Sequence, residues 1–273
     1  MAHKMIRALV ADDSSPVRAL VNQGIRIHQE KRYFEIENSE DGQKAIDALR
    51  KKPFDLAFID INMPGLTGSQ VVAAMSETQS KGCLSIAISS QMDGGHEKVL
   101  KDFGAYHFLQ KPFSKQDVAD IVSAYMTMTE VYPVMIVDDS ATMRKLTRKT
   151  LDGSRFQFDV DEAGSAEEAR RKLRRGDFRI VITDFHMPDI DGLELAGMIR
   201  ELSSKVAIYM MSTNDTTYLE RSAAFIGING FLKKPFNSSD IDSLMHKLLG
   251  LEDPKFGKVR DLFSFLERDK KAS

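Results

Sequence analysis

The chain repeats itself at a spacing of roughly 125 residues, which is the size of a whole domain. Three blocks recur in the same order: residues 6–21 (IRALVADDSSPVRALV) at 132–147 (YPVMIVDDSATMRKLT), 54–68 (FDLAFIDINMPGLTG) at 178–192 (FRIVITDFHMPDIDG), and 106–117 (YHFLQKPFSKQD) at 229–240 (NGFLKKPFNSSD). The offset is 126 positions from Asp13 to Asp139, 124 from Asp60 to Asp184 and 123 from Lys111 to Lys234. Three blocks in one order at nearly one spacing indicate a duplicated domain.

A chain of 273 residues suits two domains of ordinary size, each able to bury its own core. The repeat predicts one domain over residues 1–129, a second over 130–250, and a tail over 251–273 that lies outside the repeat. Residues 129–133 contain no Gly/Ser-rich linker, so we expect the two domains to be coupled.

Composition and charge argue against several classes of protein. The chain is 42% hydrophobic and 29% charged with a net charge of −2, so no overall field favours nucleic acid or an anionic membrane. Cys83 is the single cysteine and cannot form an internal disulfide, which fits a reducing compartment and a buried thiol. With no secretory segment and no apolar run long enough to span a bilayer, we expect a cytoplasmic protein without nucleic-acid or membrane partners.

Within each repeat, short apolar runs alternate with helical patterns, which indicates an α/β domain whose parallel sheet is covered on both faces. In the first repeat we predict strands at residues 6–10, 34–38, 56–60, 85–89 and 107–109, and helices near 16–26, 43–51, 68–77, 95–103 and 115–128. Ser15 before Pro16 is expected to cap the first helix. The second repeat copies this pattern from residue 134 to about 249.

Polar residues follow the predicted strands, at the edge of a parallel sheet where such folds place their sites. They are Asp12, Asp13, Asp60, Ser89 and Lys111 in the first repeat, matched by Asp138, Asp139, Asp184, Ser212 and Lys234 in the second. At about 5 Å and an effective dielectric of about 20, each pair of carboxylates repels by roughly 3 kcal/mol. Mg²⁺ would remove this conflict and then bind phosphate oxygens. A lysine and a hydroxyl nearby complete a site where one carboxylate could become an acyl phosphate.

These motifs resemble the receiver (CheY-like) domain of two-component response regulators. The resemblance rests on Asp-Asp after the first strand, Asp-x-x-Met-Pro-x-x-x-Gly after the third, a serine after the fourth and Lys-Pro-Phe after the fifth, and it covers about residues 5–250, twice. It implies two flavodoxin-like (βα)5 doubly wound domains in tandem, each with sheet order 2-1-3-4-5.

The resemblance also implies a role for each residue. Asp60 and Asp184 would accept a phosphoryl group from a histidine kinase or a histidine phosphotransfer protein. One Mg²⁺ per receiver would be held by Asp12, Asp13, Asp60 and the Asn62 carbonyl, and by Asp138, Asp139, Asp184 and the His186 carbonyl. Lys111 and Lys234 would neutralise the phosphoryl group, Ser89 and Ser212 would be the switch hydroxyls, and Phe108 and Phe231 stand at the switch aromatic.

Simpler interpretations remain beside these. Asp13 could cap a helix, Asp60 and Asp184 could be plain strand-end aspartates, Lys111 could be a turn lysine, and Phe108 and Phe231 could be permanent core.

His186 stands where the first repeat has Asn62, and Asn214 where it has Gln91, so the two sites are expected to lose phosphate at different rates. In the tail, Phe256, Val259, Phe263 and Leu266 recur at helical spacing, which predicts an amphipathic helix of open purpose.

Three classes of function compete. The first is a signalling protein with two phosphorylatable receivers and no attached output domain, acting through an unknown downstream protein and enzymatic only in its own phosphorylation and dephosphorylation. Within this class, a phosphorelay intermediate or a phosphate sink with one purely regulatory receiver is an alternative. A flavodoxin-type electron carrier would need a glycine- and hydroxyl-rich loop in place of Asp12 and Asp13. A small-molecule aspartyl-phosphate phosphohydrolase would need Asp-x-Asp and a cap domain.

Overall fold

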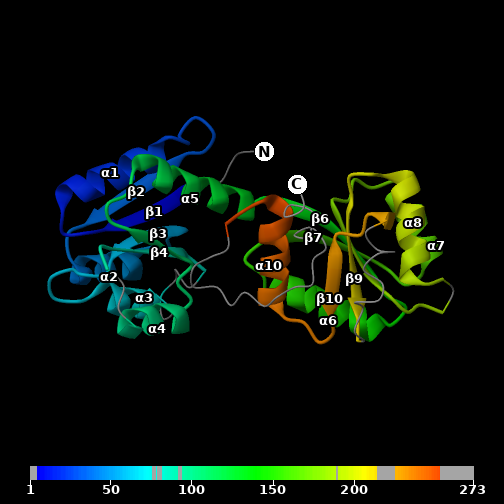
Figure 1. Cartoon of the computed structure of the whole chain (residues 1–273). Helices are drawn as coiled ribbons and strands as arrows, with labels where there is room; N and C mark the ends of the chain where they lie inside the picture. The colour runs from blue at the N-terminus through cyan, green and yellow to red at the C-terminus, as the bar shows by residue number, and fades with distance from the viewer. Residues whose placement is uncertain are drawn as a thin grey trace, which may run out of the picture. The chain divides into compact units, whose positions relative to one another are not determined.

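The computed structural model describes residues 5–75, 78, 82–91, 94–188, 190–213 and 225–252. The chain divides into two compact units, with the boundary between Thr127 and Met128. Each unit contains a five-stranded parallel sheet with helices on both faces (Figure 1).

The first unit alternates strands and helices along the chain. Its elements are β1 (Ile6–Ala11), α1 (Ser15–Arg26), β2 (Phe34–Ser39), α2 (Gly42–Lys51), β3 (Leu56–Asp60), α3 (Gly68–Met75), β4 (Leu84–Ser89), α4 (Gly94–Asp102), β5 (His107–Gln110) and α5 (Lys115–Met128). The strand order is β2-β1-β3-β4-β5. Helices α1 and α5 lie on one face of the sheet, and α2, α3 and α4 lie on the other (Figure 1).

The second unit has the same plan. Its described elements are β6 (Val131–Val137), α6 (Ala141–Asp152), β7 (Gln157–Ala163), α7 (Ala166–Leu173), β8 (Ile180–Asp184), α8 (Gly192–Leu202), β9 (Ala207–Ser212), β10 (Gly230–Lys233) and α10 (Ser238–Leu249). The strand order β7-β6-β8-β9-β10 is the same arrangement as in the first unit. Two doubly wound sheets of order 2-1-3-4-5 confirm the predicted fold class.

The predicted element boundaries in the first unit hold to within one residue, except that α3 is described only to Met75. The prediction that Ser15 caps α1 is wrong. The helix begins at Ser15, its N-cap is Ser14, and the Ser14 side chain forms no capping hydrogen bond. The Asp12 Oδ1 atom instead accepts a hydrogen bond from the Ser14 amide at 2.8 Å. The Asp12 carboxylate therefore satisfies the amide of the N-cap residue itself.

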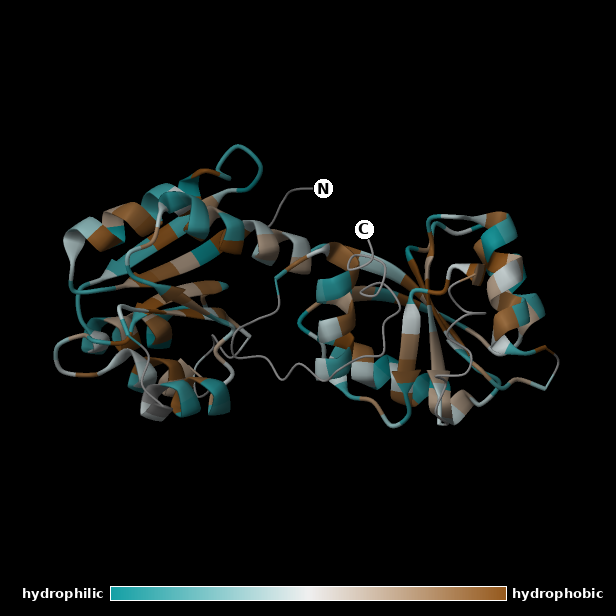
Figure 2. Cartoon of the chain, in the orientation of Figure 1, coloured by the Kyte–Doolittle hydropathy of each residue, from teal (hydrophilic) through white to brown (hydrophobic). Residues whose placement is uncertain are grey.

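The hydrophobic core of each unit lies between the central strands and the helices that cover them. Strands β3, β4 and β9 are buried along their whole length. Figure 2, coloured by hydropathy, shows apolar residues along the central strands of the first sheet. Cys83 is buried, as predicted. Phe108 and Phe231 also belong to the two cores, with exposed fractions of 9% and 6%, which is the packing expected of the core interpretation.

Among the helices in the described part of the chain, none is long and apolar enough to cross a membrane. The amphipathic helix predicted in the tail falls on residues 253–273, which lie outside the described residues.

Candidate functional site

Three carboxylates of the first unit meet at the carboxyl edge of its sheet. Asp12 and Asp13 follow β1, Asp60 ends β3, and β1 pairs with β3 in parallel. One oxygen from each of these side chains lies within 4.8 Å of the others. Asp12 and Asp60 are buried, with exposed fractions of 0% and 3%, whereas Asp13 is exposed. The strand order therefore brings together the acidic residues that the sequence predicted as a cluster.

Lys111 neutralises the buried part of this cluster. It follows the edge strand β5, and its backbone amide donates to the Ser89 carbonyl at 2.8 Å, which keeps it beside β4. Its Nζ atom donates to Asp12 Oδ2 at 2.9 Å and to Asp60 Oδ2 at 3.1 Å. One ammonium group thus bridges two carboxylates that come from different strands.

Burial and charge act in opposite directions on these groups. Removal from water raises the pKa of Asp60, with the Asp12 charge adding to the rise, although hydrogen bonds from Lys111 and the Asn62 amide oppose it. Burial lowers the pKa of Lys111, but its hydrogen bonds to Asp12 and Asp60 outweigh burial, so the net shift is upward. The lysine therefore stays charged, and the acidic cluster remains short of positive charge.

The close approach of α3 to the end of β3 also holds the backbone of Asp60 in place. At Gly68, the first residue of α3, an added Cβ atom would lie 2.1 Å from the Asp60 carbonyl oxygen. No side chain fits at that distance, so glycine allows α3 to begin directly against the end of β3. Gly192 has the same place in the second unit, where a Cβ atom would lie 2.7 Å from the Asp184 carbonyl oxygen.

Ser89 lies beside the cluster and is hydrogen-bonded in this structure. Its side chain is buried, and its Oγ atom donates to the Gln91 carbonyl at 2.7 Å. The Asn62 side-chain amide donates to Ser89 Oγ at 3.3 Å, and so does the Gln91 backbone amide at 3.3 Å. The hydroxyl predicted as a switch is therefore held by the residue two positions after Asp60.

The second unit builds the same cluster from the repeated residues. Asp138, Asp139 and Asp184 place one oxygen each within 4.8 Å of the others. Lys234 Nζ donates to Asp138 Oδ2 at 3.2 Å and to Asp184 Oδ1 at 2.9 Å. The Asp184 side chain is 16% exposed, against 5% for Asp60. The predicted lysine and carboxylates thus come together in both units.

His186 does not reproduce the contacts of Asn62. Its side chain is exposed, and its ring packs edge-on against Phe185 with centroids 4.7 Å apart. The Phe185 amide donates to Asp184 Oδ1 at 2.9 Å, whereas in the first unit the Asn62 amide reaches Asp60 Oδ1 at 3.4 Å. The loop after the third strand therefore holds its aspartate differently in the two units.

Two arginines that the sequence reasoning missed shape the loops that carry the paired aspartates. Arg18 Nη1 donates to the carbonyls of Asp12 at 2.6 Å and Asp13 at 3.2 Å. Arg144 repeats this arrangement, with 2.8 Å to the Asp138 carbonyl and 3.3 Å to the Asp139 carbonyl. Both arginines occupy the same position of the repeat, so their matching offset was a signal that could have identified them.

The donor set fits a hard divalent cation. Each cluster offers three carboxylates at one edge, of which one is exposed to solvent, and Mg²⁺ is bound in proteins by a few carboxylates together with retained waters. The same positions argue against a flavin phosphate, because anionic side chains at the end of the first strand repel an anionic ligand.

Comparisons with known proteins agree with this geometry. The family model of the response regulator receiver domain matches residues 8–123 and 134–246. The chemotaxis protein CheY1 of Helicobacter pylori is 32% identical over 123 residues, which are 44% of this chain and 98% of that protein. Chemotaxis protein CheY-3 of Vibrio cholerae is 31% identical over 117 residues, which are 42% of this chain and 89% of that protein.

A solved structure covers both units at once. It is described as a probable two-component system response regulator/GGDEF domain protein, and it is 25% identical with a TM-score of 0.59. The match spans 91% of this chain and 100% of that one. Together with the doubled family match, this shows that the chain belongs to the response regulator family and carries two CheY-like receiver domains in tandem.

Proposed function

We propose that each receiver accepts a phosphoryl group on its strand-end aspartate, Asp60 in the first and Asp184 in the second, from a phosphohistidine of a kinase or phosphotransfer protein. The observation that supports this most directly is the lysine that bridges two carboxylates, with distances between 2.9 and 3.2 Å in both domains. The arrangement is retained in both copies of a duplicated domain, which is expected of a shared chemical task and not of a chance surface cluster.

The chemistry follows from the groups at the edge of the sheet. An Asp60 oxygen forms a bond to phosphorus while the bond from phosphorus to the histidine nitrogen breaks, and the nitrogen leaves with the electron pair. Asp12, Asp13 and Asp60 would hold Mg²⁺, which offsets the negative charge that develops on the phosphoryl oxygens. Lys111 supplies a second positive charge, and Ser89 offers a buried hydroxyl beside the cluster.

The second receiver is proposed to work in the same way. Asp138, Asp139 and Asp184 would hold the cation, Lys234 would neutralise the phosphoryl group, and Ser212, which ends β9, would be the switch hydroxyl. The Asn62 and His186 carbonyls, the residues two positions after each acceptor, are proposed as additional oxygen ligands. Signal output is proposed to pass through protein–protein contacts of the receivers.

The test is phosphorylation with a small acyl phosphate and Mg²⁺, followed by intact mass. We expect two phosphoryl adducts on the wild type and one on each of the variants Asp60→Asn and Asp184→Asn. Asp102→Asn, which changes an aspartate at the exposed end of α4, serves as the control and keeps both adducts. Adducts that persist in the double variant Asp60→Asn/Asp184→Asn would contradict the proposal, and a single adduct on the wild type would favour a receiver that is only regulatory.

A further inference from the structure

The second receiver carries a concentrated basic segment in a domain that is otherwise acidic. Residues 170–179 (RRKLRRGDFR) contain six Lys or Arg and one Asp, whereas residues 130–250 as a whole contain 17 Lys or Arg and 19 Asp or Glu. The matching residues 46–55 of the first receiver (IDALRKKPFD) contain three Lys or Arg and two Asp. The positive charge is therefore a local feature of one receiver and not a property of the whole chain.

Three arginines of this segment are exposed, and none of them forms an ion pair with a described residue. Arg171 lies in α7, Arg174 is the C-cap of this helix, and Arg175 follows in the next turn. Their spacing of i, i+3 and i+4 places the three side chains on one face of the helix. The neighbouring cations Arg170 and Lys172 are instead paired with carboxylates of the same domain, at 3.1 and 2.8 Å. The three exposed guanidinium groups are thus available to a partner.

The charge at the end of α7 exceeds what the helix itself requires. Cations near a helix C-terminus are favoured by the helix dipole, and α2 of the first receiver also has two cations in its last turn. At two further positions the receivers differ in sign: Asp47 and Asp55 of the first correspond to Arg171 and Arg179 of the second. The dipole accounts for the cations that the receivers share, but it does not account for these two differences.

The amino edge of the second sheet adds an apolar side chain near the arginines. Arg179 directly precedes β8 and is 51% exposed, with Glu130 at 3.6 Å and the Tyr132 ring 4.7 Å below its guanidinium group. Val131, which begins β6, is 57% exposed. Alternate residues of a strand point to the same face, and Met135 of β6 belongs to the core that α7 covers. Val131 therefore lies on the α7 side of the sheet.

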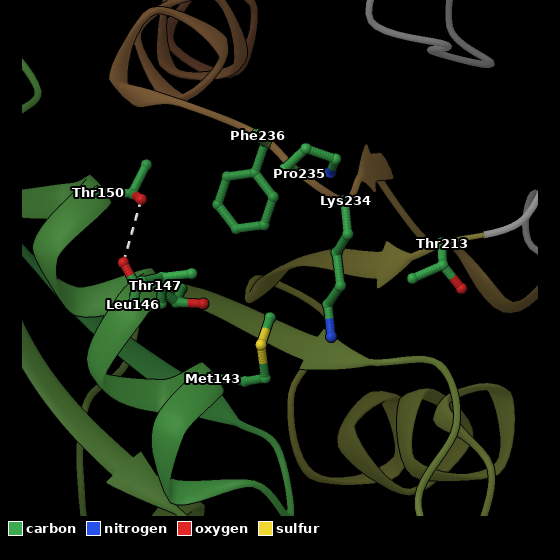
Figure 3. Close-up of a pocket in the computed structure, with 8 residues that line it drawn as sticks. All are labelled: Met143, Leu146, Thr147, Thr150, Thr213, Lys234, Pro235 and Phe236. Carbon is green, nitrogen blue, oxygen red and sulfur yellow. Dashed lines mark hydrogen bonds between the residues drawn. The ribbon is translucent and has the colours of Figure 1, made fainter.

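These residues lie at the opposite edge of the sheet from the acidic cluster. Arg179 stands before the start of β8 and Asp184 at its end, which separates them by roughly 16 Å at about 3.3 Å per residue. Lys234, with the cavity of about 250 Å³ that it lines, lies at the other edge, where β9 and β10 end (Figure 3). A molecule bound to the arginines would therefore leave the acidic cluster accessible.

We propose that this part of the second receiver binds an acidic segment of a partner protein. The surface, called the arginine surface below, consists of Val131, Arg171, Arg174, Arg175 and Arg179. Guanidinium groups form bidentate hydrogen bonds with carboxylates, and arginine is enriched among the residues that dominate binding energies at protein interfaces. The exposed valine adds an apolar contact that a protein side chain can cover. Binding requires no phosphoryl group on either receiver.

Other anionic or flexible partners fit this surface less well. A nucleic acid strand carries a phosphate about every 3.4 Å, and it would meet Asp177, which is exposed between Arg175 and Arg179. An acidic protein segment can place single carboxylates on the arginines and avoid this aspartate. The chain's own residues 253–273 contain six Lys or Arg and four Asp or Glu, so their charge has the wrong sign for this surface.

The test measures binding of a labelled peptide to the full-length protein without a phosphoryl donor, so it is independent of the proposed phosphorylation. The probe is a ten-residue peptide of glutamates with one central leucine, followed by fluorescence anisotropy. We expect saturable binding that weakens as salt rises from about 50 to 200 mM. Arg174→Asp/Arg175→Asp should reduce the affinity by about tenfold or more, and Arg171→Asp by about threefold or more.

The matched control changes the same two positions of the first receiver. Arg50→Asp/Lys51→Asp makes the same change of charge at the end of α2 and is expected to bind the peptide as the wild type does. All of the replaced side chains are exposed, so thermal unfolding of each variant should match that of the wild type.

Several results would overturn the inference. They are absence of saturable binding, equal binding of a peptide with lysines in place of glutamates, and an equal loss of affinity in the first-receiver control. Tighter binding of a single-stranded oligonucleotide or of anionic lipid vesicles at the same salt, abolished by Arg174→Asp/Arg175→Asp, would replace the protein partner by that ligand. A dimer in sedimentation that the same variant abolishes would replace it by a second copy of the chain.

Discussion

The two receiver domains hold the same reactive groups in the same geometry but surround them with different side chains. In each, a lysine donates to two aspartates over distances of 2.9 to 3.2 Å. Around that centre, the Asn62 side chain donates to Ser89 of the first receiver, whereas His186 of the second is exposed and packs on Phe185. The Asp184 side chain is also more exposed than that of Asp60, 16% against 5%.

A second difference lies in how the loop after the first strand is supported. In the second receiver, Glu162 accepts from Arg144 at 3.2 Å and from Arg148 at 2.7 Å. In the first, the corresponding strand position is Asn38, which accepts a hydrogen bond from the Asn22 amide at 3.1 Å. The charged residues that follow the strands are therefore the same in the two receivers, whereas the residues at neighbouring positions differ in charge and exposure.

The largest expected effect tests the part that the two receivers share. Gly68→Ala is expected to destabilise the first receiver by about 3 kcal/mol, because the new Cβ atom would overlap the backbone oxygen of Asp60. The distance available is 2.1 Å at Gly68 and 2.7 Å at Gly192, so Gly192→Ala should cost less in the second receiver. Hydrogen exchange monitored at increasing denaturant concentration reports on each receiver separately, and it measures the loss of stability in both variants.

Gly197→Ala is the matched control, because Gly197 lies within α8 and a Cβ atom there would meet nothing within 4 Å. Alanine is the better helix former, so this change should stabilise the domain by about 0.5–1 kcal/mol. If Gly68→Ala were as mild as the control, the close approach of α3 to β3 would not be a constraint on the site.

A smaller effect tests the arginine support of the second receiver. Glu162→Gln removes the charge that holds Arg144 and Arg148, and should destabilise this receiver by on the order of 1 kcal/mol, because the groups are partly solvent-exposed. It should also weaken Mg²⁺ binding to the second receiver, since Arg144 holds the carbonyls of Asp138 and Asp139. Thermal unfolding and metal titration measure the two effects, and Asn38→Gln in the first receiver is the control.

The same variant has a defined pH dependence. Hydrogen bonds from Arg148, opposed by burial and assisted by Arg144, lower the pKa of Glu162 in the folded protein. A carboxyl whose pKa is lowered on folding contributes its stability above its unfolded pKa of about 4.3, and the contribution disappears as pH falls through the lower folded value. The stability difference between wild type and Glu162→Gln should therefore be full at pH 7 and shrink below about pH 4. A difference that persisted unchanged at low pH would show that charge is not the cause.

Much of the fold was predictable because the repeat and the strand-end residues constrain each other. Asp12 and Asp60 follow two neighbouring parallel strands, so their side chains come together at one edge of the sheet, and Lys111, after the edge strand, donates to both. Element boundaries followed from the same apolar runs, which is why most agree to within one residue.

What the sequence did not predict depends on contacts between side chains that are distant in the chain. Arg18 donates to carbonyls five and six residues earlier, a contact that depends on how α1 leaves the strand and not on residue type. The cap of α1 was assigned to Ser15 because serine before proline is a common helix start, yet the helix begins at Ser15 and the N-cap is Ser14, whose amide donates to the Asp12 carboxylate. The cavity beside Lys234 likewise lies between α6 and the segments that follow β9 and β10, which no motif records.

The smallest expected effect concerns the residue two positions after each acceptor, where the receivers differ most directly. Asn62 and Gln91 both hydrogen-bond Ser89, so the first receiver must break these contacts before the hydroxyl can turn to a phosphoryl group. In the second receiver His186 is exposed, and the Asp184 side chain is 16% exposed against 5% for Asp60. We therefore expect the two phosphoryl groups to be lost at rates that differ by about threefold or more, equivalent to roughly 0.7 kcal/mol of activation free energy.

Exchanging these residues sharpens the comparison into a single measurement. Asn62→His in an Asp184→Asn background and His186→Asn in an Asp60→Asn background each leave one receiver to follow by intact mass after the donor is removed. Each rate should move towards that of the other receiver. Asn62→His removes the side chain that donates to Ser89, and His186→Asn introduces an asparagine at the matching position of the second receiver. Equal rates in the two wild-type receivers, or rates that do not respond to the exchange, would contradict this explanation. The backbone of the loops after Asp60 and Asp184 would then set the lifetime of the phosphoryl group. The feature to change next would be the amide contacts to these aspartates, which are 3.4 Å from Asn62 and 2.9 Å from Phe185.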